Sequence, residues 1–162
     1  AIARGDARFT HRLVSRRMLE VYNSTGDHLP RLRRRPYNPA FLCADDLSAL
    51  GVATGEVVRI ESEHDFVYAV AEASADVRPG VVSLAHARGG APEDDGAVRS
   101  IGCNTGRLVS CARDFEPISG IPRQSAIPVN VRKLSDAEHS AIARSERLPA
   151  PPPGAAPAAR EG

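Results

Sequence analysis

Glycine turn signals alternate with runs of β-branched residues in two stretches of the chain, residues 50–60 and 78–86. This pattern is typical of tight turns that lead into the strands of a compact barrel. The pattern predicts a turn at Thr54-Gly55, a strand over 57–62, a returning strand over 66–71 and a corner at Pro79-Gly80. We therefore expect a mainly β fold with short helices.

Two short helices are predicted beside these strands. Asp45 or Asp46 can cap a helix in which Leu47 and Leu50 share one face, and Gly51 is placed to close it in a left-handed conformation. Further along, Ser135 and Glu138 have the spacing of a capping box, which predicts a helix over 135–147.

The rest of the organisation follows from composition. Residues 148–162 are almost entirely Pro, Ala and Gly and lack the apolar mass to offset their ordering entropy, so we expect a disordered, passive tail there. The remaining residues, 1–134, are expected to form one barrel domain. Its core must be built from Val, Leu, Ile and Ala, because only 4% of the residues are aromatic and none is Trp.

We expect neither a targeting leader nor a membrane span. No apolar run is long enough to cross a bilayer and no leader opens the chain, so we expect no membrane insertion and a cytoplasmic location. The chain begins at Ala1 without an initiator Met, which leaves open whether it is a piece of a longer polypeptide.

The charge is distributed unevenly. Residues 1–35 hold nine arginines against three acids, a net of +6, whereas the rest of the chain carries −5. A basic entry segment suits an anionic partner, because arginine offers phosphate a rigid fork of donors. For residues 31–35 the alternative is a solvated surface run. No stacking aromatics are interleaved with these arginines, so we expect no nucleic acid partner.

The three cysteines form no Cys-x-x-Cys pair and are odd in number, which argues against a disulfide framework or a zinc site. They also cannot supply the four thiolates of an iron–sulfur cluster. We expect Cys103 to be a small buried apolar residue. The five histidines show no metal-binding spacing, so no metal ligand is predicted on this chain.

Eight short sequence motifs follow one another along the chain. Each motif alone is a weak signal, but their shared order is specific. They are 13–17, 22–24, 38–39 leading to Asp46, 50–60, 78–86, 102–104, 116–122 and 127–129. In these motifs, from about Phe9 to Leu134, the chain resembles the C-terminal molybdopterin-dinucleotide-binding domain of the molybdenum and tungsten oxidoreductases related to dimethyl sulfoxide reductase and formate dehydrogenase.

This resemblance implies a six-stranded double-psi β-barrel of the aspartate-decarboxylase-like class. It implies that the chain binds the molybdopterin guanine dinucleotide part of a bis-pterin cofactor that carries molybdenum, or alternatively tungsten. The metal ligand, the catalytic residues and any iron–sulfur cluster would lie on domains absent from this sequence. Those catalytic domains, in the same chain or in a separate subunit, are the expected partners, and the isolated chain is expected to bind without turnover.

The resemblance also implies which residues contact the cofactor. Hydroxyl, amide and guanidinium groups suit the pyrophosphate, for which we expect Ser15, Arg16, Arg17, Asn23 and Ser24. Asn104 offers an amide to the pterin, and His86 is expected to line the site. Relatives often have a basic residue just before the final strand, where this chain has Gln124 or Ser125, so a neutral contact is expected there.

Other functions compete with this one. A free-standing barrel subunit or an interaction module without its own catalysis remains the main alternative, and the proline-rich stretch 149–153 would be its docking ligand. A self-processing decarboxylase requires a Gly-Ser bond, which the chain lacks. No Ser-His-Asp set or paired carboxylates stand out as an independent catalyst.

Overall fold

The structure is a computed structural model that describes residues 8–20, 22–23, 25–26, 29, 31 and 35–147. Ser24 and the predicted tail over 148–162 lie outside the described residues. The helices and strands are, in chain order, β1 (His11–Arg16), β2 (Ala40–Leu42), α1 (Ala44–Leu50), β3 (Val57–Glu61), β4 (Phe66–Ala73), β5 (Val81–Ala85), the 3₁₀ helix η1 (Pro92–Ala97), α2 (Val98–Ile101), the 3₁₀ helix η2 (Thr105–Leu108), β6 (Ser125–Lys133) and α3 (Asp136–Arg147).

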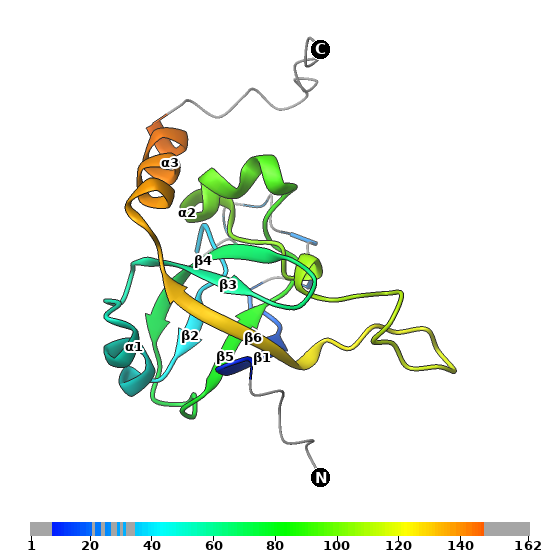
Figure 1. Cartoon of the computed structure of the whole chain (residues 1–162). Coiled ribbons are helices and arrows are strands. Elements are labelled where there is room, and N and C mark those ends of the chain that lie inside the picture. The colour runs from blue at the N-terminus through cyan, green and yellow to red at the C-terminus, as the bar shows by residue number, and fades with distance from the viewer. Residues whose placement is uncertain are drawn as a thin grey trace, which may run out of the picture.

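Six strands close into a barrel in the order β1-β5-β2-β4-β3-β6 (Figure 1). Two pairings are parallel, β1 with β5 and β2 with β4, and the other pairings are antiparallel. Since parallel neighbours cannot be joined by a hairpin, other strands separate each pair along the chain: β3 lies between β2 and β4, and β2, β3 and β4 lie between β1 and β5. The barrel confirms the predicted six-stranded, mainly β fold.

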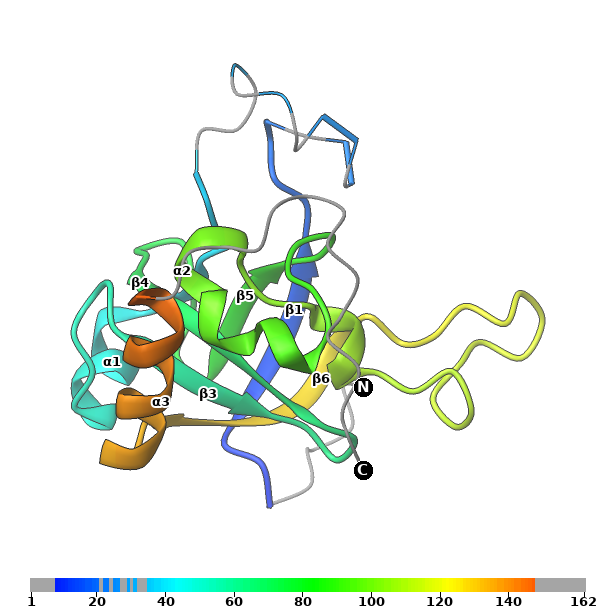
Figure 2. The same ribbon diagram turned by 90° about the horizontal axis from the view of Figure 1, so that it is seen from above.

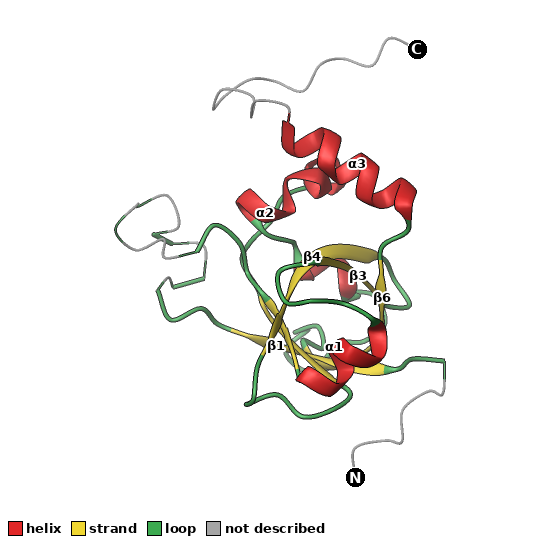
Figure 3. Ribbon diagram, turned by 90° about the vertical axis from the view of Figure 1, so that its left-hand side faces the viewer, coloured by secondary structure: helices red, strands yellow, loops and turns green. Residues whose placement is uncertain are grey.

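Aliphatic side chains fill the barrel, as the composition predicted. Buried residues alternate along β1, β2 and most of β6. Leu13, Ile60 and Leu84, which come from three different strands, are fully buried. Leu47 of α1 and Ile142 of α3 join the same cluster. Figure 3 shows α2 and α3 together on one side of the barrel, with α1 away from them.

The segment around α1 confirms most of the local predictions and corrects one. Gly51 closes the helix with a φ of 63°, and the turns at Gly55 and Gly80 also have positive φ. The predicted capping by Asp45 or Asp46 is wrong, because the cap is Cys43, whose Sγ accepts the Asp46 amide at 3.4 Å. Both acids instead lie in the first turn, near the positive end of the helix.

Two predicted strand ends shift by one or two residues. β3 stops at Glu61 because the Ser62 hydroxyl accepts the amides of His64 and Asp65 and turns the chain. β4 continues to Ala73, two residues beyond the predicted end, because β2 pairs with its last residues.

The predicted capping box is confirmed at the start of α3. Glu138 accepts the Ser135 amide at 2.8 Å, and the Ser135 hydroxyl accepts the Glu138 amide at 3.3 Å. Glu138 also accepts two hydrogen bonds from Arg132 on β6, so the helix is joined to the barrel as well as capped.

Candidate functional site

The carboxyl ends of β1 and β5 and the start of β6 meet at one edge of the barrel. The parallel pairing places Arg16 opposite Ala85, and the His86 amide donates to the Arg16 carbonyl at 3.2 Å. On the other side of β1, the Ser15 amide donates to the Gln124 carbonyl at 3.3 Å. Strand pairing alone therefore brings together residues that lie more than a hundred positions apart.

A crevice opens at this edge and consists of two adjoining hollows. The inner hollow, of about 210 Å³, is lined in part by Asn104, and the outer one, of about 490 Å³, in part by Arg17. Both share Ser15, His86 and Gln124, so they form one continuous depression. Of the nine predicted contact residues, seven line it: Ser15, Arg16, Arg17, His86, Asn104, Gln124 and Ser125.

His86 links the crevice to the eighth predicted residue. Its Nδ1 lies 3.4 Å from the Ser15 hydroxyl, and its Nε2 lies 3.0 Å from Oδ1 of Asn23. Asn23 itself is exposed and has a positive φ of 54°, a conformation that asparagine tolerates better than most residues. The imidazole is thereby held from two sides at the mouth of the crevice.

Arg16 and Arg17 are placed differently although they are adjacent. Arg16 stacks over the Phe41 ring at 4.6 Å and donates to the Pro39 carbonyl at 3.2 Å, on the opposite face of β1 from Ser15. Burial, and then the charge of Arg35, lower the pKa of Arg16. Arg17 is exposed and lies 5.3 Å from the Tyr22 ring.

Asn104 uses part of its amide within its own loop. Its Oδ1 accepts the Gly106 amide at 3.0 Å as the cap of η2, and its Nδ2 reaches the Gly90 carbonyl at 3.4 Å. The loop is packed tightly behind it, because a Cβ at Gly89 would lie 2.4 Å from the Asn104 nitrogen. The backbone therefore positions Asn104 firmly at the crevice.

Asn38 supports the crevice from below, a role that the sequence did not reveal. It is buried, with 1% of its surface exposed. Its Nδ2 donates to the carbonyls of Ala85 and Cys103 at 2.6 and 3.0 Å, and its Oδ1 accepts the Cys103 amide at 2.8 Å. One side chain thus ties the end of β5 to the Asn104 loop. The Asn38-Pro39 motif was the only signal that could have indicated it.

A bulge in β6 directs two further residues toward the crevice. Leu13 of β1 pairs with Ile127, whereas the next residue, Val14, pairs with Ser125, so Ala126 is extra. Ala126 has a φ of 56°, which bends the strand between the barrel and the crevice. Gln124 and Ser125 lie on the crevice side of this bend, and both are exposed.

Metal ligation finds no support in the described residues. No group of three or more His, Cys, Asp or Glu side chains there is arranged to hold a metal ion. Cys103 is buried as predicted, and burial raises the pKa of its thiol to about 12, which disfavours the thiolate that binds metals.

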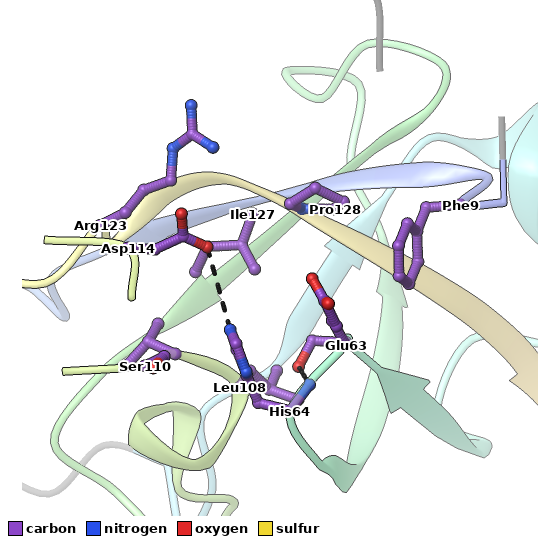
Figure 4. A pocket seen from close by; sticks show the side chains of 11 residues that line it. Phe9, Glu63, His64, Leu108, Ser110, Asp114, Arg123, Ile127 and Pro128 are labelled. Atoms are coloured by element: carbon purple, nitrogen blue, oxygen red, sulfur yellow. Dashed lines mark hydrogen bonds and ion pairs between the residues drawn. The ribbon is translucent and has the colours of Figure 1, made fainter. Parts of the chain in front are cut away.

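A third hollow lies outside the crevice, near the turn between β3 and β4. Figure 4 shows Phe9, His64 and Asp114 among the side chains that line it. His64 Nε2 is 3.9 Å from Asp114 Oδ2. The hollow has a volume of about 70 Å³, whereas one water molecule takes up about 30 Å³ in the liquid. It is therefore too small for a dinucleotide.

No helix within the described ranges combines the length and the apolar character needed to span a bilayer.

Comparison with known proteins adds a family to this geometry. A family model described as "Molydopterin dinucleotide binding domain" matches residues 12–128, most of the barrel and the whole crevice. A search of curated protein sequences found no match.

Among solved structures, the chain is similar to acetylene hydratase from Pelobacter acetylenicus, with a TM-score of 0.65 and 21% sequence identity. The match covers 78% of this chain but only 19% of that one, so the chain spans about a fifth of its structural neighbour. At this identity the similarity supports the barrel fold, and the family model carries the assignment. The chain belongs to the molybdopterin dinucleotide binding domain family, as its sequence motifs predicted.

Proposed function

We propose that the crevice binds the molybdopterin guanine dinucleotide part of a molybdenum or tungsten bis-pterin cofactor, within a larger oxidoreductase. The observation that carries this proposal is the convergence of Ser15, His86 and Gln124 at one edge of a barrel whose family is defined by dinucleotide binding. When bound, the cofactor supplies the metal centre at which substrate reacts. This chain's own residues bind and orient the nucleotide part.

The donors at the crevice fit an anionic ligand with many oxygen atoms. Arg16 Nε is a buried N–H group that has no hydrogen-bond partner among the described residues. Such a donor is costly unless an acceptor reaches it. A phosphate oxygen beside Arg16 would satisfy this donor and also oppose the repulsion from Arg35.

Arg17 is the better candidate for a contact that forms only with the cofactor. It is exposed at the rim of the outer hollow, so it can turn toward a phosphate without giving up a buried contact. Ser15, Ser125 and Gln124 add neutral hydroxyl and amide groups along the same wall. Ser24, outside the described residues, stays a contact that the sequence alone predicts.

Catalysis is assigned to other domains. Among the described residues, the crevice presents one imidazole, held between a hydroxyl and an amide, and no carboxylate lines it. We therefore place the metal ligand, any iron–sulfur cluster and the catalytic groups on domains that cover the open side of the crevice, in the same chain or in a partner subunit. The structural neighbour is an acetylene hydratase by name, so the domain alone does not fix the reaction.

The test is cofactor retention by the assembled enzyme. Loss of a charge-assisted phosphate contact should cost about 1.5 to 3 kcal/mol, and loss of a neutral contact about 0.5 to 1.5 kcal/mol. After gel filtration, Arg17→Ala should therefore retain less pterin than Gln124→Ala. Arg144→Ala on α3, an exposed arginine outside the crevice, is the matched control.

Guanosine monophosphate released by acid from the same samples would report the guanine part, and metal analysis would distinguish molybdenum from tungsten. An Arg17→Ala, Gln124→Ala double variant that keeps as much pterin as Arg144→Ala would rule out this placement.

A further inference from the structure

A long arm projects from the barrel between η2 and β6. We call residues 110–124 the arm. Figures 1 and 2 show it, in yellow-green, reaching well beyond the strands on the side opposite α1. Its base contacts the turn between β3 and β4, where Asp114 Oδ2 lies 3.9 Å from His64 Nε2, whereas its tip extends beyond every labelled element.

The arm has a defined internal structure. Phe115 and Pro122 form an antiparallel bridge, and the Arg123 amide donates to the Asp114 carbonyl at 2.6 Å. At the tip, the Glu116 carboxylate accepts the amides of Ile118 and Ser119 at 3.2 and 2.6 Å, and the Ser119 hydroxyl at 2.7 Å. A carboxylate that holds its own turn fixes the direction in which the tip presents its side chains.

Those side chains are apolar and face water. Ile118 is 94% exposed, Ile121 60% and Phe115 43%. Single exposed aliphatic residues are common, but three on one short, hydrogen-bonded projection form a surface that gains free energy on burial.

The arm starts at the crevice. Ile121 and Pro122 line its outer hollow together with Arg17 and Gln124. Any domain that covers a ligand in this hollow must therefore lie beside the arm.

We propose that the arm docks its tip, through Ile118 and Phe115, into an apolar notch on the enzyme domain that covers the dinucleotide. This inference rests on the proposed function and adds a contact outside the cofactor site. Three apolar side chains expose on the order of a few hundred Å², well below the roughly 1,600 Å² typical of a stable interface between separate proteins. A second copy is therefore a poor occupant. A domain already held against the crevice needs much less, because its effective concentration at the arm is high.

The test is hydrogen exchange of the arm in the assembled enzyme. Ile118→Ser removes the apolar contact, and Ile118→Leu is the matched control that keeps it. Ile118 lines neither hollow of the crevice. Because its side chain is exposed, a substitution there leaves the packing of the barrel core unchanged. The arm amides should exchange about tenfold faster in Ile118→Ser than in the wild type or Ile118→Leu, because exchange follows the population of the undocked state.

Equal exchange in the three proteins would overturn the proposal, as would a change from dimer to monomer caused by Ile118→Ser. Pterin content measured in the same samples separates the two proposals. An enzyme without pterin but with a protected arm contradicts the proposed function alone, whereas one with pterin and an unprotected arm contradicts the docking alone.

Discussion

His86 Nε2 and Asn23 Oδ1 lie 3.0 Å apart although the residues are separated by 63 positions in the sequence. A carboxamide oxygen can only accept, so this hydrogen bond places the imidazole proton on Nε2. In the neutral ring with this tautomer, Nδ1 is the acceptor for the Ser15 hydroxyl, 3.4 Å away. The loop that carries Asn23 thereby determines which nitrogen of His86 donates and which accepts at the crevice.

The first prediction concerns this tautomer. Neutral His86 should carry its proton on Nε2 in the wild type, and Asn23→Ala should shift it toward a mixture of the two tautomers, because the acceptor is lost. Nitrogen-15 chemical shifts of the imidazole distinguish the two forms. Ser15→Ala is the control and should leave the Nε2–H form dominant. A wild type protonated on Nδ1 would contradict the assignment.

The second prediction separates the two adjacent arginines. Arg16→Ala should lower the free energy of unfolding by about 1 to 2 kcal/mol, because its stacking on Phe41 and its bond to Pro39 are lost. Arg17→Ala should change it by less than about 0.5 kcal/mol, since Arg17 is exposed. Urea unfolding measures both. Equal losses would mean that Arg16 is not anchored as described.

The third prediction uses two glycines that both have positive φ. A Cβ at Gly89 would collide with the backbone of Cys103 and Asn104, whereas a Cβ at Gly55 meets nothing within 4 Å. Gly55→Ala should therefore cost about 1 kcal/mol, the strain of its conformation alone. Gly89→Ala should cost clearly more and should also lower pterin retention by the assembled enzyme. A Gly89→Ala variant as stable as Gly55→Ala would show that the loop yields easily.

The fourth prediction concerns the buried amide of Asn38. Asn38→Ala removes the side-chain partner of three buried backbone groups and should cost about 2 to 4 kcal/mol in urea unfolding. Asn130→Ala is the control, because that amide also bonds two backbone groups but at an exposed site. It should cost about 0.5 to 1.5 kcal/mol. Similar costs would exclude a supporting role for Asn38.

The fifth prediction is a pH dependence. The hydrogen bonds from Arg132 hold the pKa of Glu138 far below its ordinary value of 4.5. A lowered carboxyl pKa contributes stability that is present above pH 4.5 and is lost as the pH falls, because the unfolded state then binds the proton. The free energy of unfolding should thus decline below pH 4.5, and less steeply in Glu138→Gln. An equally steep decline in Glu138→Gln would contradict this assignment.

Local signals in the sequence predicted the elements whose geometry is set locally. Gly51, Gly55 and Gly80 occupy the left-handed positions that the turns required, and Ser135 and Glu138 cap α3. The short strand β2 carries no such signal, since its three residues become a strand only by pairing with β4 and β5.

The candidate site, like the fold, combines features that the sequence predicted with features that only strand geometry reveals. The resemblance indicated the residues that gather at the crevice, but not how they face. Strand alternation places Arg16 and Ser15 on opposite faces, a consequence of β1 that the motif alone did not reveal. Cys43 was missed as a helix cap because a thiol is a weak acceptor and is seldom found there.

The bulge at Ala126 has a consequence for how this domain can diversify. Because of the extra residue between Ser125 and Ile127, the strand keeps its pairing in the barrel from Ile127 onward. The positions of residues 124 and 125 at the crevice are set independently of that pairing. Exchanges at those two positions therefore leave the packing of Ile127, Val129 and Val131 untouched. Two neutral residues at positions 124 and 125 can therefore replace a basic side chain without weakening the closure of the barrel. Ligand preference can change in this way while the scaffold stays the same.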